Sequence, residues 1–308
     1  MGSVEHQIDH HKSIFTLGSC FAEHMADRMK YFLFDIYSNP NGIIYNPISL
    51  ANVLENVISD YRYQQHDLIK NEDVWYSWNH HHLIYHQSEG ELLNQLNNKK
   101  ASARKHLAKS HFLMITFGSA FAYQYNLSEN IVANCHKIPG TSFTKIRLGI
   151  EEIVKRWQSL ISDLTERNPK LQIIFTVSPV RHIKDGLIEN QKSKSILLLA
   201  TDQLVQKFEC VHYFPAYEIM MDDLRDYRFY ASDMIHPSQD AVDYIWNRFI
   251  DTYASDSCKS LMLEIDKLQR ATAHRLHNPN SNTSFRFRKK TEDGWKALYQ
   301  KYPFLAQG

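Results

Sequence analysis

Short apolar runs, separated by segments with helical periodicity, constrain the fold of this 308-residue chain more than any other feature. Between and after the runs, apolar residues recur every three or four positions, as in Phe21, Met25 and Met29. The runs are partly β-branched and lie at 14–17, 112–117, 171–177 and 211–214. Strands that alternate with helices are typical of a mostly parallel sheet covered by helices on both faces. The chain is therefore predicted to adopt a three-layer α/β/α fold.

Two regions depart from this alternation. Residues 60–110 are polar and rich in His, Asn and Gln, which predicts an insertion formed by a hairpin and then a helix over 91–109. Residues 256–308 are predicted to form a helical C-terminal extension, interrupted by the polar loop 278–282. We therefore expect a main domain over 1–255, with its insertion around 60–110, followed by the extension.

The charge balance argues against a nucleic-acid or membrane partner. The chain carries 35 Lys and Arg residues against 34 Asp and Glu residues, so no excess charge favours either surface. The basic stretch 286–290 is interpreted as a solvated helix face. No apolar stretch approaches the length of a membrane span, and residues 1–12 contain no signal-peptide core. A cytoplasmic protein is expected, and its oligomeric state is left open.

The cysteine and histidine residues indicate neither a disulfide framework nor a metal site. The 4 cysteines are widely spread and form no CxxC pair, which favours free thiols. His80, His81 and His82 are interpreted as part of an exposed polar loop, and the adjacent Cys135 and His136 are poorly spaced for one ion. No metal and no cofactor is predicted.

Two segments carry the residue types that acyl transfer requires. Ser19 and Cys20 follow the first apolar run and precede a helical pattern, so a hydroxyl and a thiol lie at a helix N-terminus. Asp233 precedes His236 by three residues, again just before a helix. A carboxylate so placed can orient an imidazole toward a nucleophile. The alternative for Ser19 is a purely structural role as the helix cap.

Several segments of the sequence resemble a known family. The segment 17–22 (LGSCFA) is similar to the signature of the GSCFA family, found largely in bacteria, which is itself similar to the SGNH (GDSL-type) esterases and lipases. Further segments fit the same family in its order, and the resemblance covers roughly residues 13–252. They are 39–47, 134–137, 178–182 and 227–236. SGNH enzymes have a three-layer α/β/α fold, which the resemblance implies here.

The resemblance also implies roles for individual residues. Ser19 matches the nucleophile, His236 the base and Asp233 the orienting acid, while the backbone N–H groups of Ser19 and Gly42 match oxyanion donors. Cys20, directly after Ser19, remains an alternative nucleophile.

The third sequence block departs from the SGNH pattern. Gly118-Ser119 stands where those enzymes carry a Gly-x-Asn-Asp string, so either Ser119 or Asn134 is expected to supply the side-chain donor to the oxyanion. Arg181 and His182 follow another strand and are candidate cationic donors to an anionic or polyhydroxyl group, unless Arg181 pairs with a carboxylate of the fold.

The sequence thus predicts a serine acyl-ester hydrolase of SGNH type that acts on a small-molecule or carbohydrate ester. Acetylated carbohydrate is the substrate expected by analogy with the resembling enzymes. The alternative is a non-catalytic glycan- or acyl-binding protein that retains the hydrolase fold, which the missing third-block asparagine favours.

Overall fold

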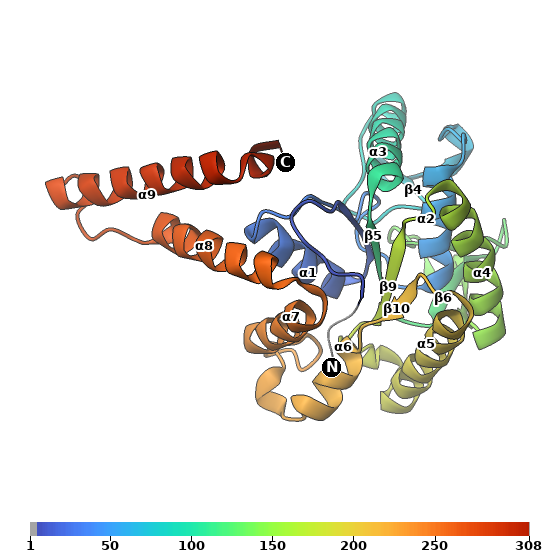
Figure 1. Ribbon diagram of the computed structural model, residues 1–308. Coiled ribbons are helices and arrows are strands. Elements are labelled where there is room, and N and C mark those ends of the chain that lie inside the picture. The colour runs from blue at the N-terminus through green and yellow to red at the C-terminus, as the bar shows by residue number, and fades with distance from the viewer. Residues whose placement is uncertain (1–4, 308) are drawn as a thin grey trace.

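The centre of the molecule is a 5-stranded parallel sheet with the strand order β10-β9-β5-β1-β2 (Figure 1). The computed structural model describes residues 5–307, so residues 1–4, at the start of the polar N-terminal segment, and Gly308 lie outside the described residues. The strands are β1 (Ile14–Gly18), β2 (Ile36–Ser38), β5 (Phe112–Phe117), β9 (Gln172–Val177) and β10 (Val211–Tyr213). The apolar runs predicted to be strands are confirmed as β1, β5, β9 and β10.

Helices cover both faces of the sheet, which confirms the predicted three-layer α/β/α fold (Figure 1). One face packs against α1 (Cys20–Tyr31) and α7 (Gln239–Tyr253). The other packs against α2 (Pro47–Ile58), α3 (Glu89–Lys109), α4 (Ile150–Arg167) and α5 (Leu187–Lys207). Every residue of β1 and β5 is buried, as expected for central strands with helices on both sides.

Trp157 of α4 anchors the helices to the second face of the sheet. Its ring is fully buried and lies 5.3 and 5.1 Å, between ring centroids, from Phe117 of β5 and Phe175 of β9. The indole Nε1 donates to the carbonyl oxygen of Pro47, at the start of α2, at 3.1 Å. One side chain therefore joins α2, α4 and two central strands without leaving its polar atom unpaired.

Gly18, at the end of β1, is required by the close approach of β5. A Cβ at this position would lie 2.5 Å from the carbonyl oxygen of Thr116, and the backbone has φ +147°. Gly18 N–H donates to Asn39 Oδ1 at 2.9 Å. The chain can therefore turn directly from β1 into α1, which begins at Cys20.

Residues 60–110 form a hairpin and a helix that pack together beside the main core. The strands β3 (Leu68–Asn71) and β4 (Val74–Ser77) pair antiparallel, and α3 begins at Glu89 with Ser88 as its N-cap. A small apolar cluster joins this hairpin to the first half of α3. It contains Tyr63, Leu68, Ile84, Leu92 and Leu96.

A second small sheet, which the sequence did not predict, lies between β5 and α4 in the chain. Its strands are β6 (Phe121–Tyr125), β7 (Ile131–Val132) and β8 (Phe143–Arg147), in the antiparallel order β7-β6-β8. Short helical turns fill several of the remaining connections. They are η1 (Gln65–Asp67), η2 (Gly140–Ser142), η3 (Ile183–Asp185), α6 (Ala216–Glu218), η4 (Ile219–Asp223) and η5 (Tyr227–Phe229).

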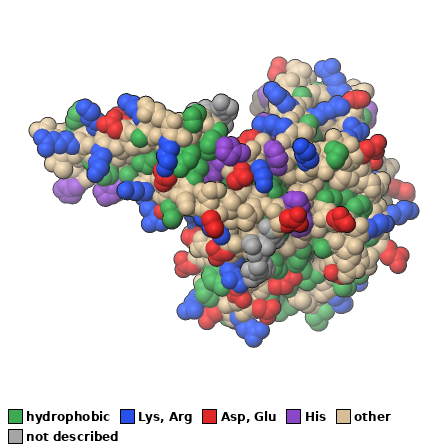
Figure 2. Space-filling model, in the orientation of Figure 1, with side chains coloured by type: hydrophobic (Ala, Val, Ile, Leu, Met, Phe, Trp, Pro, Cys, Tyr) green, Lys and Arg blue, Asp and Glu red, His purple; other side chains and the backbone are tan. Residues whose placement is uncertain are grey.

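The C-terminal residues form an arm that projects from the α1 and α7 side of the domain (Figures 1 and 2). It consists of α8 (Asp256–Ala273) and α9 (Asn282–Lys301), followed by η6 (Pro303–Gln307). An apolar seam of Leu261, Ile265, Leu298 and Leu305 joins the two helices. Lys and Arg side chains are dispersed over the arm (Figure 2). Within the described part of the chain, no helix combines the length and apolar character needed to cross a membrane.

Candidate active site

His236 and Asp233 lie in the loop between η5 and α7, where their side chains are hydrogen-bonded. His236 Nδ1 lies 2.7 Å from Asp233 Oδ2, and Asp233 Oδ1 accepts from the backbone N–H groups of Ile235 and His236 at 2.9 and 3.0 Å. The hydrogen bond from the imidazole, together with the two backbone donors, lowers the pKa of Asp233 to about 2. The carboxylate therefore stays ionised and orients the ring so that Nε2 can exchange a proton.

Ser19 is enclosed at the N-terminus of α1. It is the N-cap residue, with φ −71° and ψ 178°, but its side chain makes no capping hydrogen bond. The residue is 1% exposed, and its buried Oγ has no hydrogen-bond partner among residues 5–307. Ser19 therefore occupies the capping position without the side-chain cap considered from the sequence, and no hydrogen bond between Ser19 and His236 is formed in this structure.

Cys20 and His236 line one pocket of about 470 Å³. The pocket lies at the carboxyl ends of the parallel strands: Cys20 follows β1, Ser119 follows β5, and Arg181 follows β9. Open α/β sheets place ligand sites at this edge. One wall comes from the small sheet, through Phe121, Tyr123 and Lys145. Of the other residues predicted for the site, Asn134 and His182 also line the pocket.

Gly42 does not offer the oxyanion donor that the resemblance implied. Its N–H donates to the carbonyl oxygen of Asn39 at 2.8 Å, in a turn where Gly42 has φ +77°. The backbone N–H of Ser19 likewise donates to the carbonyl oxygen of Thr116, at 3.3 Å. Both predicted backbone donors are therefore used within the fold.

Ser119 and Asn134 differ in the hydrogen bonds that they already make. Ser119 Oγ accepts from the N–H of Phe121 at 3.1 Å and lies 3.3 Å from Ser193 Oγ. Asn134 Oδ1 accepts from the N–H of His136 at 2.9 Å, which fixes the amide, whereas its Nδ2 has no acceptor within the described residues. Asn134 is therefore the better prepared donor to a group in the pocket.

Arg181 and His182 do not form a pair of cations. The guanidinium of Arg181 lies 4.0 Å from the ring centroid of Tyr230 and 5.7 Å from that of Tyr227, and no carboxylate of the described chain pairs with it. Burial lowers the pKa of His182 to about 4, and its buried Nε2 has no partner among the described residues. Arg181 therefore brings a positive charge to this side of the pocket, and His182 does not.

Lys194 of α5, which the sequence did not predict, supports the site without lining the pocket. It is 1% exposed, and Nζ donates to the carbonyl oxygens of Gly118 and Ser178, at 2.8 and 2.7 Å. Burial lowers its pKa to about 7. The carbonyl oxygens follow β5 and β9, so the lysine ties together two strand ends that form the site. Its spacing of three and four residues from Leu197 and Asn190, both buried on α5, was the available signal.

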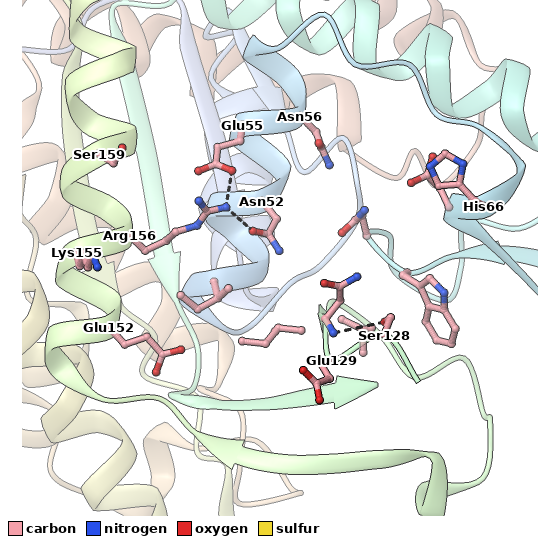
Figure 3. Close-up of a pocket in the computed structure, with 17 residues that line it drawn as sticks. Asn52, Glu55, Asn56, His66, Ser128, Glu129, Glu152, Lys155, Arg156 and Ser159 are labelled. Atoms are coloured by element: carbon pink, nitrogen blue, oxygen red, sulfur yellow. Dashed lines mark hydrogen bonds and ion pairs between the residues drawn. The ribbon is translucent and has the colours of Figure 1, made fainter. Parts of the chain in front are cut away.

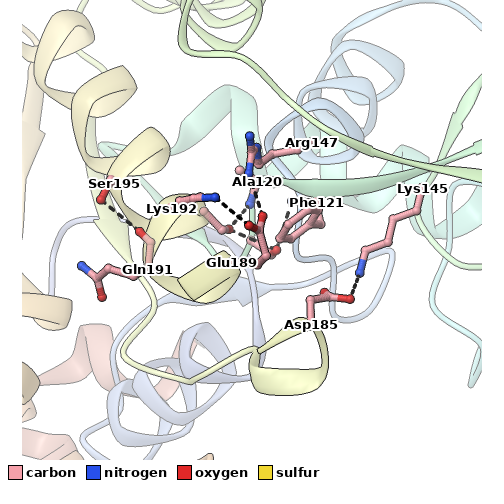
Figure 4. Close-up of polar contacts among 11 residues, drawn as sticks. Ala120, Phe121, Lys145, Arg147, Asp185, Glu189, Gln191, Lys192 and Ser195 are labelled. Atoms are coloured by element: carbon pink, nitrogen blue, oxygen red, sulfur yellow. Dashed lines mark hydrogen bonds and ion pairs between the residues drawn. The ribbon is translucent and has the colours of Figure 1, made fainter. Parts of the chain in front are cut away.

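Ion pairs close the edge of the pocket between β8 and α5 (Figure 4). Lys145 pairs with Asp185 of η3 and lies 4.6 Å from the ring centroid of Phe121. Arg147 Nη1 lies 2.7 Å from a carboxylate oxygen of Glu189, at the start of α5. The charges of Lys145 and Arg147 are thus matched locally, in contrast to that of Arg181.

A larger pocket, of about 840 Å³, lies between α2, α4 and the turn that joins β6 to β7 (Figure 3). Arg156 lines this pocket. Its guanidinium pairs with the carboxylate of Glu55 and donates to Asn52 Oδ1 at 2.7 Å. His66 is the imidazole that lines this pocket, and it contacts the hydroxyl of Tyr61 at 3.1 Å. No carboxylate–histidine pair comparable with Asp233 and His236 lines it, so the smaller pocket is the candidate active site.

His80 has a structural role. His80 is fully buried, with Nδ1 2.9 Å from Ser77 Oγ, and burial lowers its pKa to about 3. The expectation of an exposed loop is therefore wrong for His80. Within residues 5–307, His, Cys, Asp and Glu side chains form no group of three or more that could hold a metal ion.

Comparison with solved structures finds distant similarities. A protein described as a GDSL-like lipase, from Parabacteroides merdae, matches with 14% identity and a TM-score of 0.43, covering 84% of this chain and 99% of its own. The family 3 carbohydrate esterase of Clostridium thermocellum matches with 10% identity, a TM-score of 0.36 and coverages of 82% and 98%. An acetyl xylan esterase from Butyrivibrio proteoclasticus matches with 11% identity, a TM-score of 0.40 and coverages of 78% and 63%.

Comparison with curated protein sequences finds no match. The model of the GSCFA family, in contrast, matches residues 13–249. This range runs from the start of β1 into α7 and includes the segments of Cys20, Lys194, Asp233 and His236. The chain therefore belongs to the GSCFA family.

Proposed function

We propose that the protein is an acyl-ester hydrolase with its active site in the pocket that His236 lines. The observation that carries this proposal is the 2.7 Å contact between His236 Nδ1 and Asp233 Oδ2, which leaves Nε2 for proton transfer. The loop after β1 brings a hydroxyl and a thiol to a helix N-terminus at the same edge of the sheet. Nucleophile, base and orienting acid are then all available for acyl transfer.

In the proposed reaction, His236 accepts the proton of the nucleophile and returns it to the leaving alcohol, while Asp233 orients the imidazole. The amide Nδ2 of Asn134 donates to the oxyanion that forms on the former carbonyl oxygen. Ser19 is the nucleophile that the sequence resemblance implies.

The proposed substrate is an acetylated carbohydrate or a related polyhydroxyl ester. Phe121 and Tyr123 provide apolar and aromatic surface on one wall, and Arg181 and Asn134 provide hydrogen-bond donors. A sugar ring needs both kinds of contact, because its C–H faces pack on aromatic rings and its hydroxyls take hydrogen bonds.

The proposal is tested by the release of acetate from 4-nitrophenyl acetate and from peracetylated glucose. His236→Asn is expected to lower kcat by about 10²-fold or more, the usual contribution of a general base. Asp233→Asn is expected to lower it similarly, because the ring loses its anchor. Asp226→Asn is the matched control, since this nearby carboxylate caps η5 through the N–H of Arg228 and does not contact His236.

The alternative, a binding protein that retains the fold, is favoured by one observation: the hydroxyl of Ser19 is not hydrogen-bonded to His236. Under that alternative, the wild-type protein binds acetylated sugars but neither releases acetate nor reacts with a fluorophosphonate probe. Turnover that depends on His236 and Asp233 would exclude it.

A further inference from the structure

We propose that the nucleophile of this site is the thiol of Cys20 and not the hydroxyl of Ser19, an inference that rests on the proposed acyl-ester hydrolysis. The two residues are consecutive, yet their side chains differ in exposure to the pocket. Cys20 is half-buried and lines the pocket together with His236. Ser19 is 1% exposed and its Oγ is enclosed. An ester in the pocket therefore meets the sulfur.

The N-terminus of α1 directs backbone N–H groups toward the sulfur of Cys20. The backbone N–H groups of Phe21 and of Cys20 itself lower the pKa of the thiol and so favour its ionised form. These N–H groups belong to the first turn of the helix, where they have no carbonyl partner within the helix. A helix N-terminus stabilises a thiolate in the same way that it stabilises other anions.

Lys194 adds a positive charge near Cys20. Its two hydrogen-bond acceptors are neutral backbone carbonyls, and no carboxylate of the described residues pairs with it. Its charge lowers the pKa of the Cys20 thiol, and a charge on Cys20 raises the pKa of Lys194 in return. A thiolate at Cys20 is thus the anion that this buried ammonium group is placed to stabilise.

Burial opposes these effects and is the largest influence on the pKa of Cys20, and the negative charge of Glu23 acts in the same direction as burial. Together they leave the pKa of Cys20 above its ordinary value, so the resting group is a thiol and needs a base. His236, on the same pocket, is that base. This arrangement differs from a preformed thiolate–imidazolium pair, because the proton leaves sulfur only as the substrate is attacked.

A second cysteine of the same pocket can be compared with Cys20. Cys135 also lines it and is half-buried like Cys20. Burial raises the pKa of Cys135 to about 11, with no opposing contribution from a helix N-terminus or from Lys194. A reagent that enters the pocket therefore meets two thiols, of which Cys20 is the more easily ionised.

The reaction proceeds in two balanced steps. First, Cys20 Sγ attacks the carbonyl carbon, its proton moves to His236 Nε2, the ester C–O bond breaks, and the alcohol leaves with that proton. The product is a thioester on Cys20. Water then attacks the thioester, giving one proton to His236 and an oxygen to the acyl carbon. The C–S bond breaks, and the thiolate recovers the proton as the carboxylic acid leaves.

Alkylation by iodoacetamide, followed by peptide mass spectrometry, tests the reactivity of Cys20 without any substrate. In the wild-type protein at pH 8, Cys20 is expected to react at least tenfold faster than Cys135. At pH 6.5, where a pKa of about 7 leaves most of Lys194 protonated, Lys194→Met is expected to slow Cys20 without changing Cys135, whereas Lys192→Met, at an exposed position on the same helix, changes neither rate. Equal rates for Cys20 and Cys135 in the wild-type protein would overturn the proposal.

Acyl trapping identifies the nucleophile directly. After acid quenching during turnover of 4-nitrophenyl acetate, the acetyl group is expected on Cys20, removable by neutral hydroxylamine, in the wild-type protein and in Ser19→Ala. It is absent from Cys20→Ala, while Cys210→Ala, directly before β10, serves as the cysteine control. An acetyl group on Ser19 would overturn the thiol and leave the hydrolase proposal standing. A wild-type protein that releases no acetate, but whose Cys20 alkylates selectively, would overturn the hydrolase and support the reactive thiol.

Discussion

The ammonium group of Lys194 lies 2.7 Å from the carbonyl oxygen of Ser178, in a position that is closed to solvent. The carbonyl of Gly118 is the second acceptor, at 2.8 Å. A buried charge held by neutral acceptors costs free energy that a surface lysine does not. The fold therefore maintains, beside its candidate nucleophile, a cation that would be more stable in water.

This burial predicts how stability depends on pH. Burial lowers the pKa of Lys194 to about 7, below its ordinary value of 10.5, so between these pH values the unfolded chain binds the proton more tightly. Between pH 7 and 10.5 the lysine is protonated in the unfolded chain and mostly neutral in the folded protein. The contribution of Lys194 to the free energy of unfolding therefore rises with pH over this range, and this gain is lost as the pH falls to 7. In urea unfolding, the free energy of wild type minus that of Lys194→Met is expected to be larger at pH 9 than at pH 6.

Lys192→Met is the control for this measurement, because Lys192 is exposed on the same helix. The Lys194→Met variant also leaves two carbonyl oxygens unpaired, at a cost of about 1–3 kcal/mol each that does not depend on pH. A difference from wild type that stays constant between pH 6 and pH 9 would contradict the lowered pKa.

Gly18→Ala is expected to destabilise the protein by several kcal/mol, because two costs act together. The new Cβ would lie 2.5 Å from the carbonyl oxygen of Thr116, and alanine rarely adopts φ +147°. Thermal unfolding gives the comparison with Gly90→Ala in α3, where a Cβ meets nothing within 4 Å. The Gly90 variant should gain up to about 1 kcal/mol from helix propensity. Equal melting temperatures for the two variants would show that Gly18 is not constrained.

Arg181→Gln is expected to weaken binding of esters that carry a carboxylate, with KM raised about tenfold and kcat little changed. The guanidinium contacts two tyrosine rings and no carboxylate of the described chain, so its charge is available to a ligand. Acetylated methyl glucuronide, which keeps a free carboxylate, and acetylated methyl glucoside form the substrate pair, and only the first should respond. Arg156→Gln, in the larger pocket, is the control, and an equal change for both substrates would argue against charge recognition.

The sequence predicts the sheet well where strands are continuous and apolar. It does not predict β2, because only Ile36–Ser38 pair and all three are partly exposed. It does not predict β6 or β8 either, because each has one buried residue and is otherwise partly or fully exposed. The pairing of Asp233 with His236 follows from a local spacing of three residues. The different environments of Ser19 and Cys20 depend instead on how β5 and Gly18 direct the turn into α1, which no local pattern contains. Lys194 was missed for a related reason, since a lysine on a helix is usually solvated.

Asn134 is expected to supply the side-chain donor to the oxyanion. The sequence slightly favours Ser119 over Asn134, because Ser119 directly follows β5. In the structure, Ser119 Oγ is occupied by Phe121 N–H and Ser193, whereas Asn134 Nδ2 has no acceptor within the described residues. Asn134→Ala is therefore expected to lower kcat about a hundredfold, the usual loss for one such donor. Ser119→Ala should cost less than about tenfold.

A second substitution separates the donor from the structural role of Asn134. Its Oδ1 accepts from the N–H of His136 at 2.9 Å, and Asn134→Asp retains that acceptor while removing the amide N–H. If the amide stabilises the oxyanion, Asn134→Asp should lose at least as much kcat as Asn134→Ala, with an unchanged melting temperature. If the residue only fixes the loop, Asn134→Asp should keep near wild-type turnover. A large loss in Ser119→Ala with little loss in both Asn134 variants would return the role to the serine, because the hydroxyl would then be the group whose hydrogen bond strengthens in the transition state.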